Sequence, residues 1–262
     1  MVELRILMVG DVCGRPGREM LREHLGPLRR SHKADLVIVN GENAAAGFGI
    51  TPSVYAEIVS AGADVVTLGN HTFDKKDAMS LLDEEPHLLR PLNYPPGAPG
   101  RGAAVVVAAG ARVLVLNAMG RVFLPILLDD PFRAVDAELE AYRGRYDVAF
   151  LDFHGEATSE KEAMGWYLDG RAAAVVGTHT HVQTADERVL PKGTAYITDV
   201  GMTGPADSVL GMDKDAMVQR MLRQLPVRFE VAEGRRQLNA VVVEVDGESG
   251  MAREVQRIFI RD

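Results

Sequence analysis

The sequence lacks several features that define common protein classes. Among its 262 residues there is one cysteine, Cys13, so a framework of internal disulfides is excluded. No apolar run approaches the roughly 20 residues that a membrane-spanning helix needs, so a membrane protein of that kind is not expected. There is no block of lysine and arginine, and the net charge is −8. Duplex nucleic acid is therefore not an expected partner, because its phosphates would repel an acidic protein.

The N-terminal stretch MVELRILMVGD also lacks the basic, apolar and small-residue segments of a secretory signal peptide. This and the single cysteine fit a reducing compartment. With 47% hydrophobic and 25% charged residues, the composition is typical of a globular protein. No internal repeat or linker stands out, so we expect a single domain over residues 1–262. No heptad pattern indicates an assembly, and a homo-oligomer stays open.

Short runs rich in valine, isoleucine and leucine recur along the chain and are expected to be strands. Each is apolar over about five successive residues, which is typical of strands covered on both faces. The runs are RILMVGD, DLVIVNGEN, DVVTLGNH, RVLVLNAMG, DVAFLDFHGE, AAVVGTHTH and TAYITDVGM. Amphipathic stretches between them predict helices at 16–31, 53–63, 77–85 and 132–145. This alternation predicts an α/β fold.

Two regions depart from a purely parallel arrangement of strands. The stretch VVVAAGARVLVL predicts a hairpin that turns at residues 109–111. Near the C-terminus, VRFEVAEG, NAVVVEVDGESG and VQRIFIR are expected to be antiparallel strands. A pair of mixed sheets therefore fits the pattern better than one parallel sheet.

Polar side chains follow the predicted strands where each one ends. Ligands of α/β sheets gather at the carboxyl ends of strands, so these side chains are expected to meet at one edge. One buried histidine or one aspartate is more often a core residue or a helix cap, but the repetition at successive strands disfavours that explanation for the set. The set comprises Asp11, Glu42, Asn43, Asn70, His71, His154, His179 and His181.

The residue types in this set are those that bind metal ions. Three histidines, two carboxylates and two carboxamides, leaving His71 aside, exceed the four ligands of one zinc ion and suit two ions that share a carboxylate. A nitrogen and oxygen set without thiolate favours manganese, iron or zinc over calcium. His179 and His181 are two positions apart. If they lie on an extended segment, both project to the same side and reach one cavity.

The motifs GD (10–11), NGEN (40–43), GNH (69–71), FHGE (153–156) and GTHTH (177–181) occur in this order along most of the chain. In this the sequence resembles the calcineurin-like metallophosphoesterase superfamily and, within it, the YmdB-like branch of bacterial cyclic-nucleotide phosphodiesterases. GDVCGRPGR and ITDVGMTGPADSVLGMD add to the likeness. The resemblance implies a four-layer α/β/β/α sandwich with two mixed β-sheets and a dinuclear metal centre between strand ends. It also implies a cytoplasmic bacterial enzyme.

The resemblance also assigns roles to individual residues. His71, beside a ligand but not itself one, would be the general acid. The ligands would divide between two ions bridged by Glu42, with Asp11, Asn43 and His181 at one ion and Asn70, His154 and His179 at the other. Two positions depart from the wider superfamily: Cys13 stands where a histidine is usual, and Glu42 stands where an aspartate is usual. The glutamate agrees with the YmdB-like branch. Cys13 is interpreted as a small packed side chain rather than a thiolate ligand.

The function implied is hydrolysis of small phosphodiesters, namely 2′,3′-cyclic and also 3′,5′-cyclic nucleotides. A hydroxide bridging two divalent or mixed-valence ions, with iron or manganese favoured and zinc an alternative, would attack phosphorus. His71 would donate a proton to the leaving alkoxide. The substrate-binding residues are unknown at this stage, and contributions from Phe48, Thr203 and Ser208 are left open. Asp74 either orients His71 or caps a helix, and capping is the interpretation adopted here.

Two other functions are compatible with parts of the pattern. Metal-dependent amidohydrolases, which fold as an eight-fold helix–strand barrel, also use a His-x-His pair. In those enzymes the pair belongs to the first strand, whereas in this chain His179 and His181 come too late for eight helix–strand units to follow them. A metal-bound regulatory or RNA-interaction protein would retain the fold without catalysis. The full ligand set and His71 argue against a degenerate site.

Overall fold

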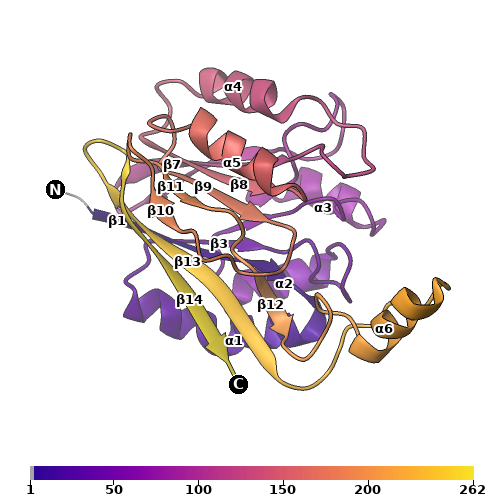
Figure 1. Ribbon diagram of the computed structural model, residues 1–262. Coiled ribbons are helices and arrows are strands. Elements are labelled where there is room, and N and C mark those ends of the chain that lie inside the picture. Colours follow the sequence, from indigo (N-terminus) through magenta and orange to yellow (C-terminus); the bar gives the residue numbers. More distant parts are fainter. Residues whose placement is uncertain (1–2) are drawn as a thin grey trace.

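Two mixed sheets lie face to face in the computed structural model, which describes residues 3–262. The first two residues of the N-terminal stretch MVELRILMVGD lie outside the described residues. Helices cover the outer face of each sheet, which gives four layers in the order α/β/β/α (Figure 1). The predicted fold is therefore confirmed.

The first sheet combines a parallel half with an antiparallel half. Strands β1, β3, β4 and β5 are parallel neighbours, while β13 runs antiparallel to β1. Along its other edge β13 pairs with β14, and β12 connects β13 to β2. The strands are β1 (Glu3–Val9), β2 (Asp11–Val12), β3 (Leu36–Asn40), β4 (Val65–Thr67), β5 (Leu88–Leu89), β12 (Met202–Pro205), β13 (Arg236–Asp246) and β14 (Ala252–Arg261).

The second sheet has the order β10-β11-β9-β8-β7-β6. Its four central strands are parallel, and its two edge strands are antiparallel to their neighbours. The strands are β6 (Ala103–Ala108), β7 (Ala111–Met119), β8 (Val148–His154), β9 (Ala174–Thr178), β10 (Arg188–Val189) and β11 (Ala195–Ile197). The predicted hairpin joins β6 to β7, and Ala109 and Gly110 in its turn have φ angles of 49° and 83°.

The core lies between the two sheets and beneath the helices. Ile6 and Met8 of the first sheet belong to the same apolar cluster as Val113 and Phe150 of the second. Because helices close the outer faces, the central strands are buried on both sides, and every residue of β3 is buried. This double burial explains the continuous apolar runs in the sequence.

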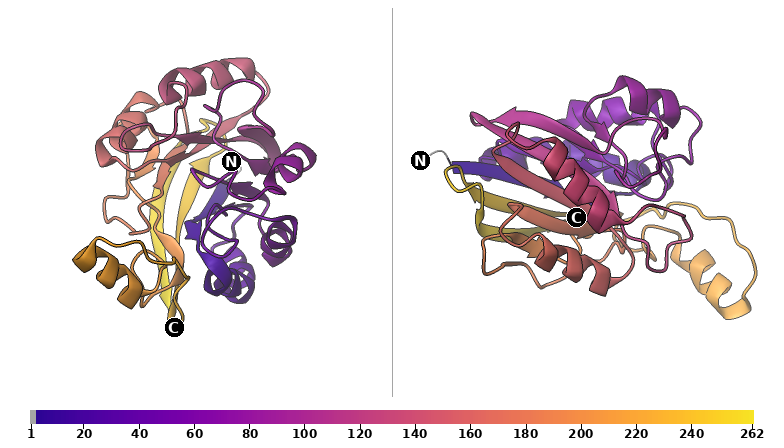
Figure 2. Two further views of the ribbon diagram at one scale, coloured as in Figure 1. Left: turned by 90° about the vertical axis from the view of Figure 1, so that its right-hand side faces the viewer. Right: turned by 90° about the horizontal axis from the view of Figure 1, so that it is seen from above.

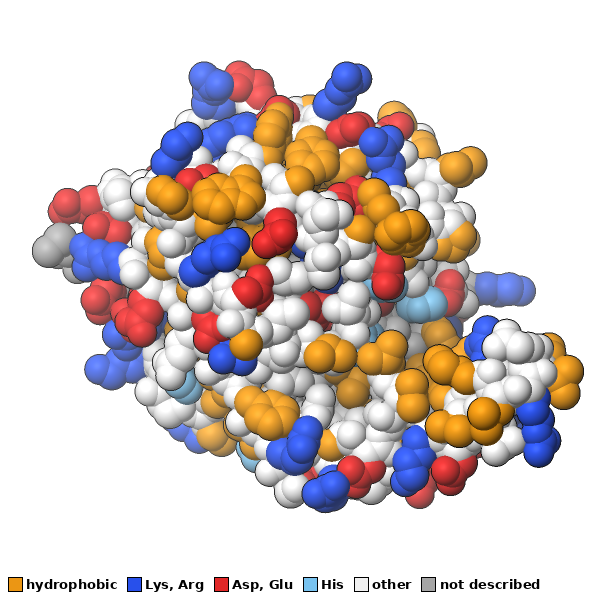
Figure 3. Space-filling view, viewed as in Figure 1, with side chains coloured by type: hydrophobic (Ala, Val, Ile, Leu, Met, Phe, Trp, Pro, Cys, Tyr) orange, Lys and Arg blue, Asp and Glu red, His pale blue; other side chains and the backbone are white. Residues whose placement is uncertain are grey.

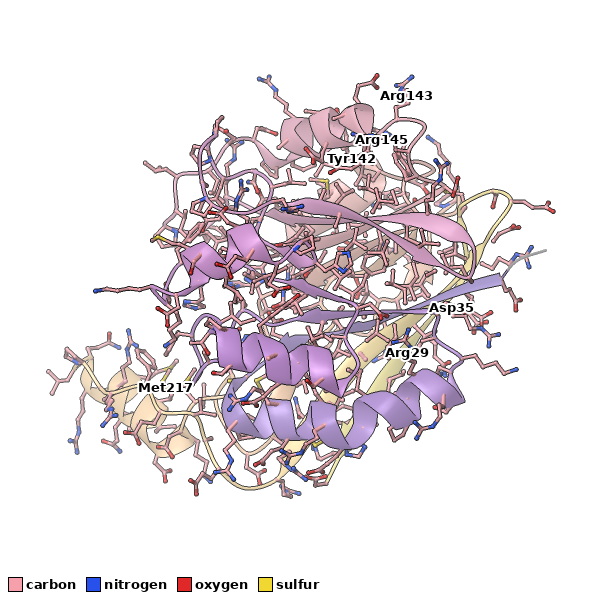
Figure 4. All side chains as sticks on the ribbon, turned by 180° about the vertical axis from the view of Figure 1, so that it is seen from behind. Arg29, Asp35, Tyr142, Arg143, Arg145 and Met217 are labelled. Atoms are coloured by element: carbon pink, nitrogen blue, oxygen red, sulfur yellow. The ribbon has the colours of Figure 1, made fainter. Side chains whose placement is uncertain are left out.

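Five helices complete the sandwich. The helices α1 (Gly14–Ser31), α2 (Pro52–Ala61) and α3 (Ala78–Glu84) pack on the first sheet, and α4 (Pro131–Ala141) and α5 (Thr158–Tyr167) pack on the second. Thr51 caps α2, accepting a hydrogen bond from the Val54 N–H at 3.4 Å. Figure 4 shows Arg29 of α1 beside Asp35, whose carbonyl oxygen it reaches at 3.1 Å. Among residues 3–262, no helix is long and apolar enough to span a membrane.

A sixth helix, α6 (Lys214–Arg223), stands away from the sandwich (Figures 1 and 2). None of its residues is buried, and its apolar side chains Val218, Met221 and Leu222 are exposed on a projecting arm (Figure 3). Met217 (Figure 4) is half-buried and packs against the cluster of Cys13, Met202 and Met212. The sequence patterns did not predict this helix. They did predict a strand at VRFEVAEG (227–234), and that prediction is wrong. Only Val231 forms a bridge there, with Met212, because the arm offers no sheet edge for the segment to join.

Candidate metal centre

The eight polar residues come together from both sheets, at the carboxyl ends of their parallel strands. Asp11 follows β1, the pair at 42–43 follows β3 and the pair at 70–71 follows β4. From the second sheet, His154 ends β8, and His179 and His181 follow β9. The packing of the two sheets therefore brings distant residues into one cluster. Asp11 and His181, for example, are 170 positions apart in the chain.

Within this cluster, two groups of side chains have the ligand types of a metal site, and Glu42 belongs to both. One group is Glu42, His154 and His179, and the other is Asp11, Glu42 and His181; in each, one ligand atom per residue lies within 4.8 Å of the others. His154 Nε2 is 3.1 Å from Glu42 Oε1 and 3.0 Å from Asn70 Oδ1. Asn43 Oδ1 is 3.2 Å from His181 Nε2. Asn70 therefore adjoins the group with His154, and Asn43 adjoins the group with His181.

Each of the three clustered histidines binds an acceptor with the ring nitrogen that faces away from the cluster. His154 Nδ1 lies 2.9 Å from the Thr178 hydroxyl, which donates its own proton to Asp152. His179 Nε2 lies 3.0 Å from the Glu156 carboxylate. In the same way, His181 Nδ1 lies 3.0 Å from the carbonyl oxygen of Leu210. In the neutral rings, these partners assign the proton to the outer nitrogen and leave a lone pair on the inner one.

The inner lone pairs face other acceptors rather than donors. His154 Nε2 and His179 Nδ1 are 3.0 Å apart, and His181 Nε2 faces the Asn43 oxygen. Asp11 Oδ1 is buried and has no hydrogen-bond partner within the described residues. Buried acceptors that converge in this way need a positive charge between them, and a cation supplies it. The donor set therefore fits divalent metal ions.

Burial and charge shift the pKa values of this cluster in opposite directions. Burial raises the pKa of Asp11 to about 6, although the charges of His181 and His154 oppose the shift. Burial lowers the pKa of His179 to about 3, and the charge of His154 adds to this. Burial also disfavours the charged forms of Glu42 and His154, but their mutual attraction outweighs it. The pKa of Glu42 falls to about 2 and that of His154 rises to about 9. In the protein without metal, a proton on His154 thus takes the place of the cation, and His154 and Glu42 form an ion pair.

Close packing at this site depends on glycine at position 69. A methyl group on Gly69 would lie 2.3 Å from both Glu42 Oε2 and His154 Nε2. Only glycine therefore lets the chain after β4 pass so close to these two groups. This gives the GNH motif a physical reason, because its first residue makes room and its second contributes the Asn70 oxygen.

His71 lies beside the two groups and belongs to neither. Its backbone N–H donates to Glu42 Oε2 at 3.2 Å, while its side-chain Nδ1 is 2.7 Å from Asp74 Oδ2. Phe48 packs against its ring edge to face, with centroids 5.0 Å apart. The interpretation of Asp74 as a helix cap is wrong, because Asp77 is the N-cap residue of α3. Asp74 instead orients the ring of His71.

Cys13, Thr203 and Ser208 make their contacts away from the cluster. Cys13 is fully buried and packs with Met202 and Met212, and burial raises the pKa of its thiol to about 12. Thr203 is buried in β12 and donates to the carbonyl oxygen of Asn239 at 3.4 Å. Ser208 bonds within its own turn, donating to the Pro205 carbonyl oxygen at 2.7 Å. The packed thiol agrees with the interpretation of Cys13 as a small core residue.

His179 and His181 line one cleft, as predicted, and belong to different groups of candidate ligands. The predicted extended segment is wrong. Strand β9 ends at Thr178, and both histidines have positive φ angles, 103° and 64°. They lie on a left-handed turn rather than on an extended segment.

An open cleft of about 290 Å³ gives access to the cluster. Its lining includes four of the candidate ligands, Glu42, Asn43, His179 and His181, together with His71. Three apolar side chains, Phe48, Leu210 and Met212, also line it. The cleft thus combines polar groups suited to a phosphate with apolar side chains.

Comparisons with known proteins agree with this arrangement. A family model described as "YmdB-like protein" matches residues 7–258. The chain belongs to the YmdB-like family. It is 52% identical to a 2′,3′-cyclic-nucleotide 2′-phosphodiesterase of Bacillus subtilis over 259 residues, which cover 99% of this chain and 98% of that protein.

Solved structures extend the comparison to the fold. A protein of Thermus thermophilus described as hypothetical has a TM-score of 0.93 at 43% identity and covers 99% of this chain and 100% of its own. A structure described as a novel phosphatase, from Mycoplasma pneumoniae, has a TM-score of 0.94 at 36% identity and covers 100% and 94%. Solved nucleotidases at 13–15% identity share the fold at TM-scores of 0.59–0.63. The YmdB-like chain thus has the metallophosphoesterase-like fold, in a family of phosphoester hydrolases.

Proposed function

We propose that this YmdB-like protein is a metal-dependent phosphodiesterase with a two-ion centre, which hydrolyses 2′,3′-cyclic and also 3′,5′-cyclic nucleotides. The observation that carries the proposal is the sharing of Glu42 between two groups of carboxylate and histidine ligands. One carboxylate common to two such groups is the arrangement that holds a close pair of ions. The Bacillus subtilis relative supports the 2′,3′-cyclic class of substrate.

The seven ligands would divide between the two ions in the same way that the histidine and asparagine contacts place them in two groups. Glu42 would be shared by both ions. Asp11, Asn43 and His181 would hold one ion, and Asn70, His154 and His179 would hold the other. Iron or manganese suits these nitrogen and oxygen ligands, and zinc is an alternative. When bound, the ions would supply an activated water for attack on phosphorus and offset charge on the phosphoryl oxygens.

His71 would provide the proton for the leaving oxygen. Its Nδ1–H donates to Asp74, so the ring is fixed and its Nε2 is free to carry the proton that is transferred. The orienting contact from Asp74 supports the role of general acid.

The shape of the cleft supports a nucleotide substrate. The volume of about 290 Å³ is close to the lower end of the range for small-molecule sites, roughly 300–1,000 Å³. Phe48, Leu210 and Met212 offer an apolar wall on which a nucleobase can pack, while the phosphate faces the ligands. None of these three side chains carries a charge to read the base edge, so we expect purines and pyrimidines to be accepted alike.

Removal and return of metal tests the proposed function directly. Protein stripped with a chelator is expected to lose hydrolysis of bis-p-nitrophenyl phosphate, and manganese or iron is expected to restore it. Turnover would then be measured with 2′,3′-cyclic and 3′,5′-cyclic nucleotides. A folded protein with no turnover under manganese, iron or zinc would contradict the proposal and favour a regulatory or RNA-interaction role.

Metal affinity is expected to fall with decreasing pH. In the metal-free protein, the pKa of His154 is about 9 and that of Asp11 about 6, so an ion must displace a proton from His154 below pH 9 and also one from Asp11 below pH 6. Each displaced proton weakens binding by up to about tenfold per pH unit. Manganese titrations at about pH 5.5, 7 and 8.5 measure this, and equal affinities would contradict it.

The contribution of His154 to the stability of the metal-free protein has the opposite pH dependence. The raised pKa of His154 contributes stability that is fully present below its unfolded value of 6.5 and is lost as the pH rises through about 9. Thermal unfolding at the same pH values therefore separates loss of the fold from loss of metal affinity.

Residues 1–262 would act as one domain on a small phosphodiester in the cytoplasm. Neither a membrane nor duplex nucleic acid is expected as a partner, and self-association is left open.

A further inference from the structure

The turn that carries His179 and His181 has an unfavourable backbone conformation. Both residues have φ angles in the left-handed region, 103° and 64°, which residues other than glycine rarely adopt. Such a conformation persists only when surrounding contacts fix it. One contact is the N–H of His179, which donates to Asp11 Oδ2 at 3.1 Å. The histidine side chains alone do not explain why the chain bends here.

The residue between the two histidines is held by a second carboxylate outside the cluster. Asp199 Oδ2 accepts the backbone N–H of Thr180 at 3.0 Å and its hydroxyl at 2.6 Å. Two bonds from one oxygen to one residue fix both the backbone and the side chain of Thr180. They therefore set the orientation of the peptide planes that lead to His179 and His181.

A buried lysine completes this contact. Lys161 of α5 is 1% exposed, and its Nζ lies 2.7 Å from the same Asp199 oxygen. The Asp199 side chain is fully buried, so its charge would be costly without this partner. Lys161 thus pairs with the carboxylate oxygen that also accepts the two Thr180 donors, and hydrogen bonds to a paired carboxylate are stronger than those between neutral groups.

The backbone around Asp199 is also fixed. Its Oδ1 accepts the N–H of Gly201 at 2.8 Å, and its own N–H donates to the Thr184 hydroxyl at 2.9 Å. The N–H of Thr184 returns a bond to the Asp199 carbonyl oxygen at 3.1 Å. Asp199 is therefore a rigid point to which the turn is attached.

We propose that Lys161, Asp199 and Thr180 are positioning residues that hold His179 and His181 in the turn from which each reaches a different metal ion. The proposal rests on the two-ion centre proposed above. Buried ion pairs also occur as plain core contacts. The distinguishing feature here is that both donors of Thr180, the one residue between the two candidate ligands, bind the paired carboxylate.

Thr180→Val tests the proposal, since it removes the hydroxyl and retains the shape and the ion pair. We expect manganese affinity to fall by about 10- to 100-fold, as is typical when a residue supporting a ligand is lost. The electron paramagnetic resonance signal of two coupled manganese ions should give way to that of separate ions. Thr180→Ser, which keeps the hydroxyl, should restore both.

Two further variants keep the test decisive. Thr194→Val removes another buried hydroxyl, which donates to the Ala172 carbonyl oxygen at 2.6 Å outside the cluster, and it should leave the manganese affinity unchanged. Lys161→Met combined with Asp199→Asn removes both charges together and leaves no unpaired buried charge. It should weaken binding in the same direction as Thr180→Val.

The outcomes separate this proposal from the function on which it rests. If wild-type protein binds no pair of manganese, iron or zinc ions, the proposed function fails. If the wild type binds two ions and both Thr180→Val and the double variant bind them with equal affinity and the same coupled signal, the positioning role is wrong. The ion pair is then a core contact only.

Discussion

Replacing Glu42 with glutamine is expected to abolish the paired metal centre and reduce hydrolysis on the order of 10³-fold. Glu42 is 1% exposed and is the one residue common to both ligand groups. The neutral amide keeps the shape but loses the charge that attracts two cations. Loss of several kcal/mol of transition-state stabilisation, at about 1.4 kcal/mol per factor of ten, gives this magnitude. Manganese stoichiometry and kcat measure the effect together.

A buried carboxylate outside the cluster provides the control for Glu42→Gln. Asp169 is 8% exposed and accepts the N–H of Lys192 at 3.1 Å. Asp169→Asn is therefore expected to cost stability without changing the number of ions bound. The proposed role of Glu42 is wrong if Glu42→Gln still binds two manganese ions and turns over substrate at the wild-type rate.

Replacing His71 with alanine is expected to lower kcat by about 10²- to 10⁴-fold, the range for loss of a positioned general acid. Metal content should stay the same, because His71 contacts Glu42 through its backbone N–H, which alanine retains. Kinetics with a 2′,3′-cyclic nucleotide, together with manganese stoichiometry, separate the two effects. Loss of metal in this variant would point to a structural role for the side chain.

The leaving group provides an internal control for the role of His71. A p-nitrophenolate leaves readily without a proton, whereas a ribose alkoxide needs one. His71→Ala should therefore slow hydrolysis of the cyclic nucleotide far more than hydrolysis of bis-p-nitrophenyl phosphate.

The rate of cyclic-nucleotide hydrolysis by Asp74→Asn should fall between those of the wild type and His71→Ala, because the substitution weakens the bond that orients the ring. His24→Ala, on α1, should match the wild type. Equal losses on both substrates would exclude proton donation to the leaving group.

The sequence by itself determined the strands and the residues at their ends. Burial on both faces requires continuous apolar runs, so β1, β3, β8 and β9 are visible from local composition. The residues at the ends of such runs are therefore visible as well. The cap of α2 at Thr51 is equally local, since it depends on neighbouring residues only.

Sequence patterns do not reveal whether a segment finds a neighbour in space. VRFEVAEG has the residues of a strand, but it lies beside the projecting arm and no strand edge is available to it. The short strands β2 and β5 show the converse, because pairing with strands farther along the chain or before it forms them without a strong local pattern. Strand formation depends on the partner as much as on the residues.

Only the tertiary structure decided how the residues of the site act together. The acceptors that fix the three histidine rings are Thr178, Glu156 and the carbonyl oxygen of Leu210, none of which follows from a spacing rule. The bond from Asp74 to His71 and the ion pair of Lys161 with Asp199 likewise depend on three-dimensional packing. Local sequence sets which side chains leave a strand end, whereas hydrogen bonds between distant segments set their orientation and protonation. The physical reason is the sequence distance over which each effect operates. A strand pattern is set by which of a few successive side chains are buried, whereas a hydrogen bond forms wherever the folded chain brings a donor and an acceptor together.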